Sequence, residues 1–415
     1  MLLEAGGNNN VFETKVPILF SKLFHSKHDW DYNTVEQKNV ANRRLYWPRG
    51  RILGGSSSMN AMVYHHCSKS DFDEWVSRYG CKGWGYDDLS PYLRRMENHS
   101  TNPSRPSINM EHRGTGGEWQ TGYSHLSQMM EKGFIASCEE IGIPANPDLN
   151  TPNDPIGVTH FQTFIDSKGQ RSSLATAYLS STDQQRPNLY VACNAHVSRV
   201  LYDHVSHGDP RAIGVEFQTV RGGDRYQVHA RKEVIISAGT VNTPQLLKLS
   251  GIGPRKELEK YNISVVQPNE TVGRNLKDHL CCTGILCKAK PGASMDYLTN
   301  DVKALPSLLR WLLTGGGPLS SNVAEAAAFI RSSDHKFETT AAENTPTYQG
   351  SNGIGPDIEI IAAPMAYIHH GEEKAPDGCN VFSLVPVSLR PQSSGSVTLQ
   401  SKDPFDHRKH TLPLL

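Results

Sequence analysis

The sequence predicts a mixed α/β or α+β protein, and three features of the chain support this prediction. Helix-type patterns cover residues 71–79, 86–98 and 126–141. From residue 188 onward, the pattern changes to short β-rich runs between Gly and Asp turns. Residues 233–239 then form an apolar run that ends in a glycine turn and leads into a helix. Such a strand–turn–helix step is typical of a parallel sheet that offers backbone N–H groups to phosphate.

The first 142 residues alternate helices with long irregular stretches. Met1-Leu2-Leu3 is apolar and is followed by Glu4 and a glycine turn, so it resembles the end of a strand. Residues 11–49 are rich in loops. Pro91 fits the first turn of the helix over residues 86–98, and Gly142 ends the third helix.

The second half is expected to hold most of the strands. Alternating or β-rich runs occupy residues 188–193, 196–202, 212–217 and 226–230. After the run at 233–239, we expect a helix that Thr243 caps, with Pro244 at its first position. A further helix over residues 302–313 and two strands at 357–362 and 381–389 follow, and the strands suggest an antiparallel sheet.

Composition excludes several classes of protein. The 415 residues hold 42 Lys and Arg and 42 Asp and Glu, so the zero formal net charge disfavours a nucleic-acid-binding protein. The apolar runs fall short of the roughly 18 residues of a membrane span, since Pro306 and Arg310 interrupt one of the longest. The eight cysteines lack metal-ligand spacing, even where Cys281, Cys282 and Cys287 cluster. We therefore predict no metal site.

One basic segment rich in Gly and Ser suits a phosphate group. Consecutive small residues at 54–58 let the backbone approach a ligand, and Arg49 and Arg51 add positive charge. A flexible surface loop is the other interpretation. The segment lacks the Lys of an ATP-binding P-loop and the last Gly of a hydrolase nucleophile elbow. Glu4 fits either a ribose ligand at the end of a strand or an ordinary surface residue.

Four segments resemble signatures of the glucose–methanol–choline (GMC) flavin oxidoreductases. Residues 50–64 read GRILGGSSSMNAMVY and residues 239–253 read GTVNTPQLLKLSGIG. Residues 272–279 read VGRNLKDH. Residues 46–50 read YWPRG, which is similar to the choline-dehydrogenase-like and aryl-alcohol-oxidase-like branches. The resemblance covers nearly the whole chain.

The resemblance implies an FAD-binding Rossmann-like domain and a substrate domain built on an antiparallel sheet. FAD would oxidise an alcohol by hydride transfer and pass electrons to oxygen or a quinone. By position, Glu4 matches the residue that binds the ribose, and residues 51–56 match the segment that lines the pyrophosphate. Residues 60–63 match the stretch that passes the flavin ring, and Val197 matches the residue that contacts adenine. The implied cofactor-binding residues are Glu4, Arg51, Gly54, Gly55, Ser56, Asn60, Ala61, Met62, Val63, Val197, Ala238, Gly239, Asn275 and Asp278.

Two of these residues, Asn275 and Asp278, also fit a purely structural role. Asn275 and Asp278, together with His279, equally suit a buried network that holds a turn. The FAD domain is expected at residues 1–62 and 185–285, and the substrate domain at residues 63–184 and 286–415. Met59 stands where some members of the family carry the His that binds FAD covalently, so noncovalent FAD is expected.

Two elements of the family are not found between Met1 and Leu415. The Gly-rich loop is expected before Glu4, and the catalytic His beyond Leu415. The chain, which stops abruptly at residues 412–415, is therefore expected to be an inactive fragment. A non-catalytic remnant of the fold and an FAD-binding hydroxynitrile lyase are the alternatives. His65, His66, His160 and His279 are the histidines considered as a substitute base, and localisation stays open.

Overall fold

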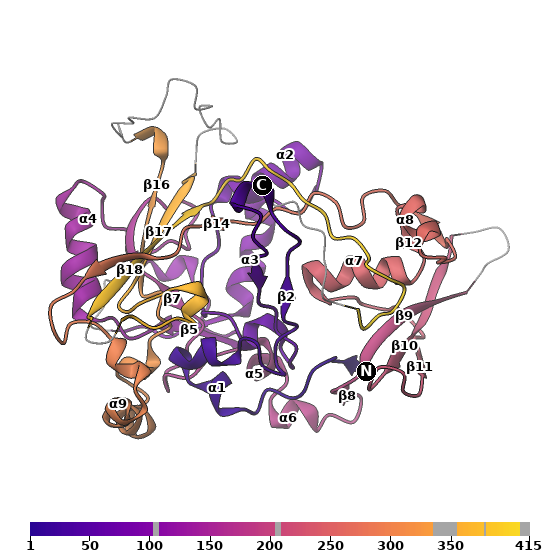
Figure 1. The fold of residues 1–415 in the computed structure, drawn as a ribbon, viewed down its shortest axis with the longest axis horizontal. Coiled ribbons are helices and arrows are strands. Elements are labelled where there is room, and N and C mark those ends of the chain that lie inside the picture. The colour runs from indigo at the N-terminus through magenta and orange to yellow at the C-terminus, as the bar shows by residue number, and fades with distance from the viewer. Residues whose placement is uncertain (103–107, 204–208, 335–354, 377–378, 407–415) are drawn as a thin grey trace.

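The computed structural model describes residues 1–102, 108–203, 209–334, 355–376 and 379–406. The chain end at residues 412–415 lies outside the described residues. Figure 1 shows a left part built on a large sheet and a right part built on a smaller sheet with helix α7 (Gly239–Leu249). Within the described ranges, no helix is long and apolar enough to cross a membrane.

The large sheet is antiparallel, which confirms the predicted second part of the fold. Its strand order is β14-β18-β17-β16-β6, and β15 also pairs with β18. Ile361 of β17 lies opposite Val385 of β18, as expected for strands predicted at 357–362 and 381–389. The strands are β6 (Gly157–His160), β14 (Leu280–Cys281), β15 (Ile285–Lys288), β16 (Ala326–Ile330), β17 (Ile358–Ala363) and β18 (Val381–Ser388).

Small residues let a helical segment pack closely on this sheet. Ala326 and Ala362 on neighbouring strands are fully buried against Met130. Met130 lies in a π-helical turn, Met129–Ile135, which continues as α4 (Ala136–Glu140). The helix predicted over residues 126–141 therefore begins three residues late, and just before it the amide of Ser127 donates to Oε2 of Glu325 (2.7 Å).

The right part holds an antiparallel meander of β9 (His196–Asp203), β10 (Arg211–Gln218) and β11 (Tyr226–His229). Helix α7 covers this sheet through Leu246, which packs on Val200 and Val215. Two short parallel pairs complete the region. They join β1 (Leu2–Leu3) to β8 (Val191–Ala192), and β12 (Ile252–Gly253) to β13 (Gln267–Pro268), and α8 (Arg255–Lys260) lies between the last two.

Two expectations for residues 233–247 are wrong. Residues 233–237 form no strand, and Ile235 is 77% exposed, since no described strand lies beside them to accept their hydrogen bonds. Helix α7 begins at Gly239 rather than near Thr243, so Pro244 lies inside it. Gly239 has a φ of +85°, which turns the chain into the helix one turn earlier than Pro244 suggested.

The other predicted helices are confirmed, with small changes at their ends. They are α2 (Lys69–Tyr79), α3 (Tyr86–Met96) and α9 (Asp301–Thr314). Ser68 and Asp71 form a capping box that starts α2. The remaining elements are α1 (Phe12–Lys15), α5 (Leu174–Tyr178), α6 (Ser181–Gln184), β2 (Tyr32–Asn33), β3 (Tyr46–Trp47), β4 (Glu97–His99), β5 (Trp119–Tyr123) and β7 (Gln162–Thr163).

Segments that cross the molecule join the left and right parts. The yellow segment after β18 in Figure 1 runs from the large sheet to α7 and α8. The Val397 carbonyl accepts a hydrogen bond from Nζ of Lys248 (2.6 Å), and the Leu399 amide donates to Oε1 of Glu257 (2.6 Å). Tyr32 and Trp47 pack on Val397 in the same core cluster. These contacts hold the segments of the candidate site.

Candidate cofactor site

The end of β1 lies directly against the basic glycine-rich segment. The Leu53 amide donates to the Gly7 carbonyl (2.8 Å). A Cβ atom on Gly6 would stand 1.9 Å from the Arg51 carbonyl oxygen, so only glycine permits this approach. Two segments that are 45 residues apart in the sequence (Gly6 to Arg51) thus run side by side, and they bring Glu4 close to Arg51.

Glu4 and Arg51 form a pair of partly buried opposite charges. Burial raises the pKa of Glu4 to about 7, while a backbone hydrogen bond from Gly6 (2.7 Å) and the charge of Arg51 act in the opposite direction. The Arg51 guanidinium lies over the ring of Trp30 at 5.2 Å. Its Nε is buried and has no hydrogen-bond partner. A buried donor without a partner is costly, so this atom suits an anionic or carbonyl oxygen of a ligand.

The glycines after Arg51 differ in their surroundings. Both Gly54 and Gly55 have positive φ, +89° and +57°. A Cβ on Gly54 would meet Oγ of Ser58 at 2.5 Å, whereas a Cβ on Gly55 would stand in open space. Ser56 is exposed, and its Oγ accepts a hydrogen bond from the Gly50 amide (3.1 Å). The open face of Gly55 is a backbone surface that a ligand can approach closely.

The segment after this turn is held in place by the protein core. Met62 is fully buried with a φ of +56°, and Val63 pairs with Thr163. The Ala61 carbonyl accepts from Nδ2 of Asn322 (2.9 Å). Asn60 is exposed and uses Oδ1 to accept the Met62 amide (3.1 Å). The position of residues 60–63 is therefore fixed by contacts with the rest of the protein.

Arg171 anchors this edge, and the sequence analysis missed it. Its Nη1 donates to the carbonyls of Ser57 (3.2 Å) and Asn60 (2.7 Å), and its Nε donates to the Thr14 carbonyl (2.9 Å). Nη2 is buried with no hydrogen-bond partner. Burial lowers the pKa of Arg171 to about 9. Nothing in its sequence surroundings, Gln170 and Ser172, signals that this charge is buried.

Val197 and the start of α7 approach the same region from the right part. Val197 lies in β9, and two residues before it the Ala195 amide donates to the Glu4 carbonyl (2.8 Å). Ala238 and Gly239 are exposed at the start of α7. Tyr32, whose hydroxyl donates to Oδ1 of Asn242 in α7, lies within electrostatic reach of Arg51. Tyr32 also stacks on Trp30, over which Arg51 lies, and so links α7 at Asn242 to the surroundings of Arg51.

Asn275 and Asp278 have different surroundings in the structure. Asn275 is exposed, with a φ of +56°, and lines a cavity of about 410 Å³ together with Thr240 and Thr243 of α7. Asp278 accepts a hydrogen bond from Nε1 of Trp47 (2.6 Å). His279 is exposed. The three residues do not form the buried network considered from the sequence, because two of them face solvent.

The histidines considered as a substitute base lie in surroundings that do not favour this role. Burial lowers the pKa of His66 to about 3, and its Nε2 lies 2.6 Å from the Tyr64 hydroxyl. Burial also lowers the pKa of His65 to about 4. His160 stacks on Tyr123 at 5.1 Å in the large sheet. At neutral pH His65 and His66 are therefore neutral, and their pKa values lie well below the operating pH that best suits a general base.

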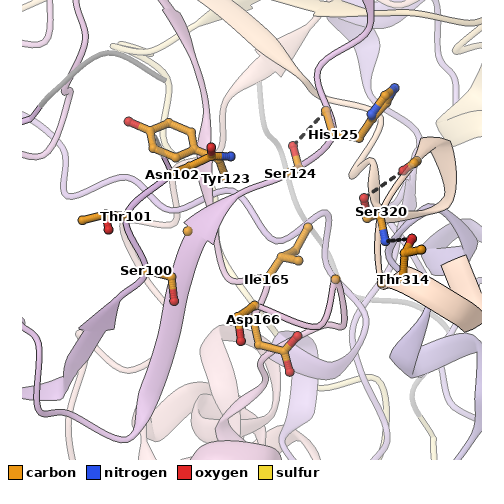
Figure 2. A pocket seen from close by; sticks show the side chains of 16 residues that line it. Ser100, Thr101, Asn102, Tyr123, Ser124, His125, Ile165, Asp166, Thr314 and Ser320 are labelled. Carbon is orange, nitrogen blue, oxygen red and sulfur yellow. Dashed lines mark hydrogen bonds between the residues drawn. The ribbon is translucent and has the colours of Figure 1, made fainter. Parts of the chain in front are cut away.

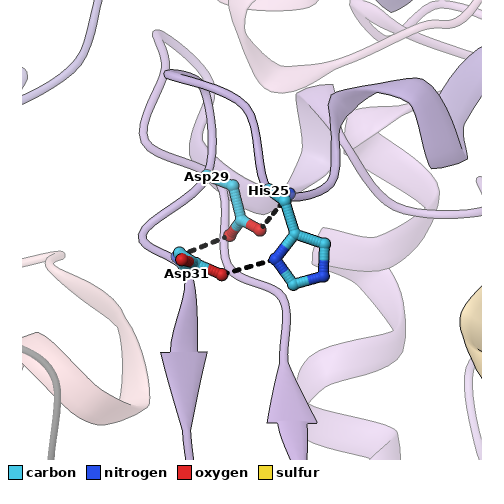
Figure 3. Close-up of side chains that lie close together, drawn as sticks. All are labelled: His25, Asp29 and Asp31. Carbon is cyan, nitrogen blue, oxygen red and sulfur yellow. Dashed lines mark hydrogen bonds and ion pairs between the residues drawn. The ribbon is translucent and has the colours of Figure 1, made fainter.

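Two further polar features lie outside the predicted residues. Figure 2 shows a cavity of about 470 Å³ that β5 and the C-terminal end of α9 line, with Asp166 at its wall. Figure 3 shows His25, Asp29 and Asp31 close together. The Asp29 carboxylate already accepts backbone amides from His25 (3.0 Å), Asp31 (3.0 Å) and Arg49 (3.0 Å) as well as the Tyr46 hydroxyl. Hydrogen bonds within the protein account for this cluster.

Comparisons with known proteins agree on one family. A family profile described as GMC oxidoreductase matches residues 14–281. Dehydrogenase str4 of Strobilurus tenacellus is 37% identical over 422 residues, which cover 98% of this chain and 67% of that protein. The mitochondrial choline dehydrogenase of Homo sapiens is 32% identical over 417 residues, which cover 98% and 64%. The chain thus spans about two thirds of the length of these relatives.

A solved structure agrees with the sequence matches. A variant of formate oxidase from Aspergillus oryzae RIB40, studied for its FAD modification, superposes with a TM-score of 0.85. The two chains are 28% identical, and the match covers 99% of this chain and 72% of the other. The fold, with helices and antiparallel sheets, is therefore shared along the whole described chain.

Proposed function

The chain belongs to the GMC oxidoreductase family, whose members are FAD-dependent oxidoreductases, and we propose that it oxidises the CH–OH group of a small alcohol. One observation carries the assignment of the cofactor site. Glu4, the unpartnered Nε of Arg51 and the open face of Gly55 lie on segments in direct contact. A carboxylate, a cation and free backbone are the groups that recognise ribose and pyrophosphate.

The residues fit FAD in a definite order. We infer that Glu4 accepts the adenosine ribose hydroxyls, and that Arg51 with residues 54–56 holds the pyrophosphate and ribityl chain. Val197 would contact adenine through its backbone. Residues 60–63 would lie along the flavin ring, and the Ala238–Gly239 turn and Asn275 would close the site from the right part. Asp278 would act indirectly, by fixing Trp47.

FAD supplies the hydride acceptor when it is bound, and the chain supplies position and electrostatics. Arg171 acts as a positioning residue because it holds the carbonyls of Ser57 and Asn60 beside the proposed ring position. His65 and His66 are not assigned as the base, because burial lowers the pKa of both to about 4 and 3. Oxygen or a quinone is proposed as the electron acceptor.

The comparisons give no support to the expectation of inactivity, nor to a non-catalytic remnant or a lyase. We therefore propose oxidoreductase activity, with the two-part division at residues 1–62 and 185–285 for FAD and the rest for substrate. The test is dye reduction by the FAD-loaded chain with a panel of primary alcohols. Saturable turnover supports the proposal. Bound flavin that no alcohol reduces under anaerobic conditions would count against it.

FAD is proposed to bind noncovalently. Met59 is 3% exposed, and its thioether offers no nucleophilic nitrogen for a flavin linkage. We expect acid precipitation of the loaded protein to release all of the yellow colour into the supernatant. Colour that stays in the protein pellet would show a covalent link through another residue.

A further inference from the structure

Helix α9 (Asp301–Thr314) presents an uncovered apolar face. Figure 1 shows this helix at the lower left edge of the molecule. Large aliphatic side chains on an ordinary protein surface are scattered singly, whereas a contiguous patch marks an interaction site. Here five of them lie on one 14-residue helix: Val302 (81% exposed), Leu305 (52%), Leu309 (52%), Leu312 (58%) and Leu313 (84%).

The opposite face of α9 is firmly packed, so the exposed face has a fixed direction. Trp311 is buried with Val16 and Leu319, and its Nε1 donates to the Gly169 carbonyl (2.8 Å). Ser307 is buried beneath the Tyr297 hydroxyl (3.1 Å). The apolar face is therefore not a frayed end that folds back on the protein.

The exposed side chains of α9 are divided into an apolar group and a charged group around the helix axis. With 3.6 residues per turn, the five aliphatic residues fall within an arc of about 100°. Lys303 and Arg310 are exposed and lie on one side of this arc, two helical turns apart, and Asp301 lies beside its other edge. Their long side chains can extend past the apolar face and keep their charges in water.

Nearby segments carry charges of both signs, since Lys374 follows Glu372 and Glu373 and Lys168 follows Asp166. Nζ of Lys374 reaches the Thr299 carbonyl (3.1 Å) just before α9 begins. The backbone of Lys168 lies against Gly315 at the other end of the helix. The helix itself contributes one acidic residue, Asp301, in its first turn. The helix thus carries two cations on one side of the apolar face and one acidic residue on the other, and its own charged residues sum to +1 (Lys303, Arg310 and Asp301).

We propose that α9 docks this protein on the surface of an anionic phospholipid membrane, with the helix lying in the plane of the interface. An exposed apolar face bordered by Lys and Arg is the pattern of interfacial helices, and the cations would meet the lipid phosphates. A second copy fits less well. A helix of this length is about 21 Å long and about 10 Å wide, so its face is far smaller than the roughly 800 Å² per partner of a stable dimer interface.

The experiment is co-sedimentation of the FAD-loaded chain with vesicles of phosphatidylcholine that contain about a third phosphatidylserine. We expect the wild-type protein to bind, and Leu309→Glu/Leu313→Glu to bind at least roughly tenfold more weakly. Lys303→Glu/Arg310→Glu should lose the preference for anionic over neutral vesicles and the sensitivity to salt.

Matched controls separate docking from a general surface effect. Ile141→Glu/Val220→Glu changes two other exposed aliphatic residues, 74% and 62% exposed, and should leave vesicle binding unchanged. Lys82→Glu/Arg95→Glu reverses two other exposed positive charges, in the α2–α3 region, and should leave the preference for anionic vesicles unchanged. Circular dichroism and flavin binding should be those of the wild type in all variants.

Three outcomes would overturn the proposal. They are a wild-type protein that does not bind anionic vesicles, binding that the α9 variants do not reduce, and an oligomer that Leu309→Glu/Leu313→Glu dissociates while vesicle binding stays absent. The last result would identify the face as a contact between copies. None of these readouts depends on catalytic turnover, so the test stands apart from the proposed reaction.

Discussion

Gly54 and Gly55 are adjacent in the sequence but have different reasons to be glycine. A Cβ on Gly54 would collide with Ser58 and contact Ala175, so this residue is required by packing. A Cβ on Gly55 would meet nothing within the protein. Its requirement is backbone conformation alone, unless a ligand occupies the open space. The difference separates a fold residue from a proposed ligand residue within one turn.

A matched pair of glycines tests this distinction. Gly55 and Gly80 have similar positive φ, +57° and +68°, and both have open space where a Cβ would stand. Alanine at either position should cost about 1–2 kcal/mol of unfolding free energy through strain alone. Only Gly55→Ala should weaken FAD, by roughly tenfold or more, because its methyl group would displace the cofactor. Flavin fluorescence titration and chemical unfolding measure the two effects; equal FAD affinity in both variants would remove Gly55 from the site.

Glu4 should make FAD affinity depend on pH. Burial raises the pKa of Glu4 from 4.5 to about 7, so its carboxyl group is largely protonated at slightly acid pH. The ionised form accepts ribose hydroxyls better, so binding FAD favours loss of the proton. Affinity is therefore expected to rise about tenfold between about pH 6 and pH 8 and then level off. The Glu4→Gln variant should lack this rise in a fluorescence titration; the same slope in both proteins would contradict the role of Glu4.

At the scale of elements, one buried arginine joins three segments. Arg171 donates to carbonyls of Thr14, Ser57 and Asn60, which belong to α1 and to both ends of the turn that follows the glycines. The position of residues 57–60 therefore depends on a residue more than a hundred positions later in the chain.

Removal of Arg171 should affect both stability and cofactor binding. Arg171→Met removes the donor of three carbonyls, and the carbonyl of the buried residue Thr14, if left unsatisfied, costs about 1–3 kcal/mol. We expect a clear loss of unfolding free energy, together with weaker FAD binding that Arg171→Lys rescues in part. Arg186→Met is the control, because Arg186 is exposed and its Nε donates to the Asp183 carbonyl (3.1 Å). Unchanged FAD affinity in a destabilised Arg171→Met would limit Arg171 to a structural role.

Local patterns predicted the elements that depend on local signals. Helices α2 and α9 and strands β17 and β18 follow from periodicity, and the structure confirms them. The run at residues 233–237 has the pattern of a strand, but a strand also needs a neighbour, and no described segment pairs with it. The burial of Arg171 is a tertiary property that composition and periodicity do not carry.

The segments of the candidate site were predictable from the sequence, but their arrangement in space was not. The segments around Glu4 and Arg51 were found through the family signatures, and the structure places these two segments side by side. Their distance in space could not be read from the residues alone, because it depends on the close approach at Gly6. The different surroundings of Asn275 and Asp278 were not predicted either, because they depend on tertiary contacts such as the hydrogen bond from Trp47 to Asp278.

At the scale of the whole molecule, the charges balance, but the large sheet contains one partly buried acid with a raised pKa. The chain has zero formal net charge, so long-range repulsion contributes little to the dependence of stability on pH. Glu359 lies in β17, opposite Val387 and Phe329, and burial raises its pKa from 4.5 to about 7. Its ionisation should therefore be a main source of pH-dependent stability within this sheet.

The sign of the effect follows from proton binding. Between about pH 4.5 and pH 7 the folded state keeps the proton of Glu359 while the unfolded state loses it. The unfolding free energy therefore falls as the pH rises through this window and is constant above it.

Glu359→Gln removes the ionisable group and should be more stable than wild type at pH 8, by up to roughly 3 kcal/mol. At about pH 4.5 the two proteins should differ little, because Glu359 is then neutral in the folded wild type. Thermal unfolding across this range measures the difference, with the exposed residue Glu140 changed to Gln as the control. A Glu359→Gln variant that gains no stability over wild type as the pH rises would show that the Glu359 carboxylate has a favourable partner in the folded protein.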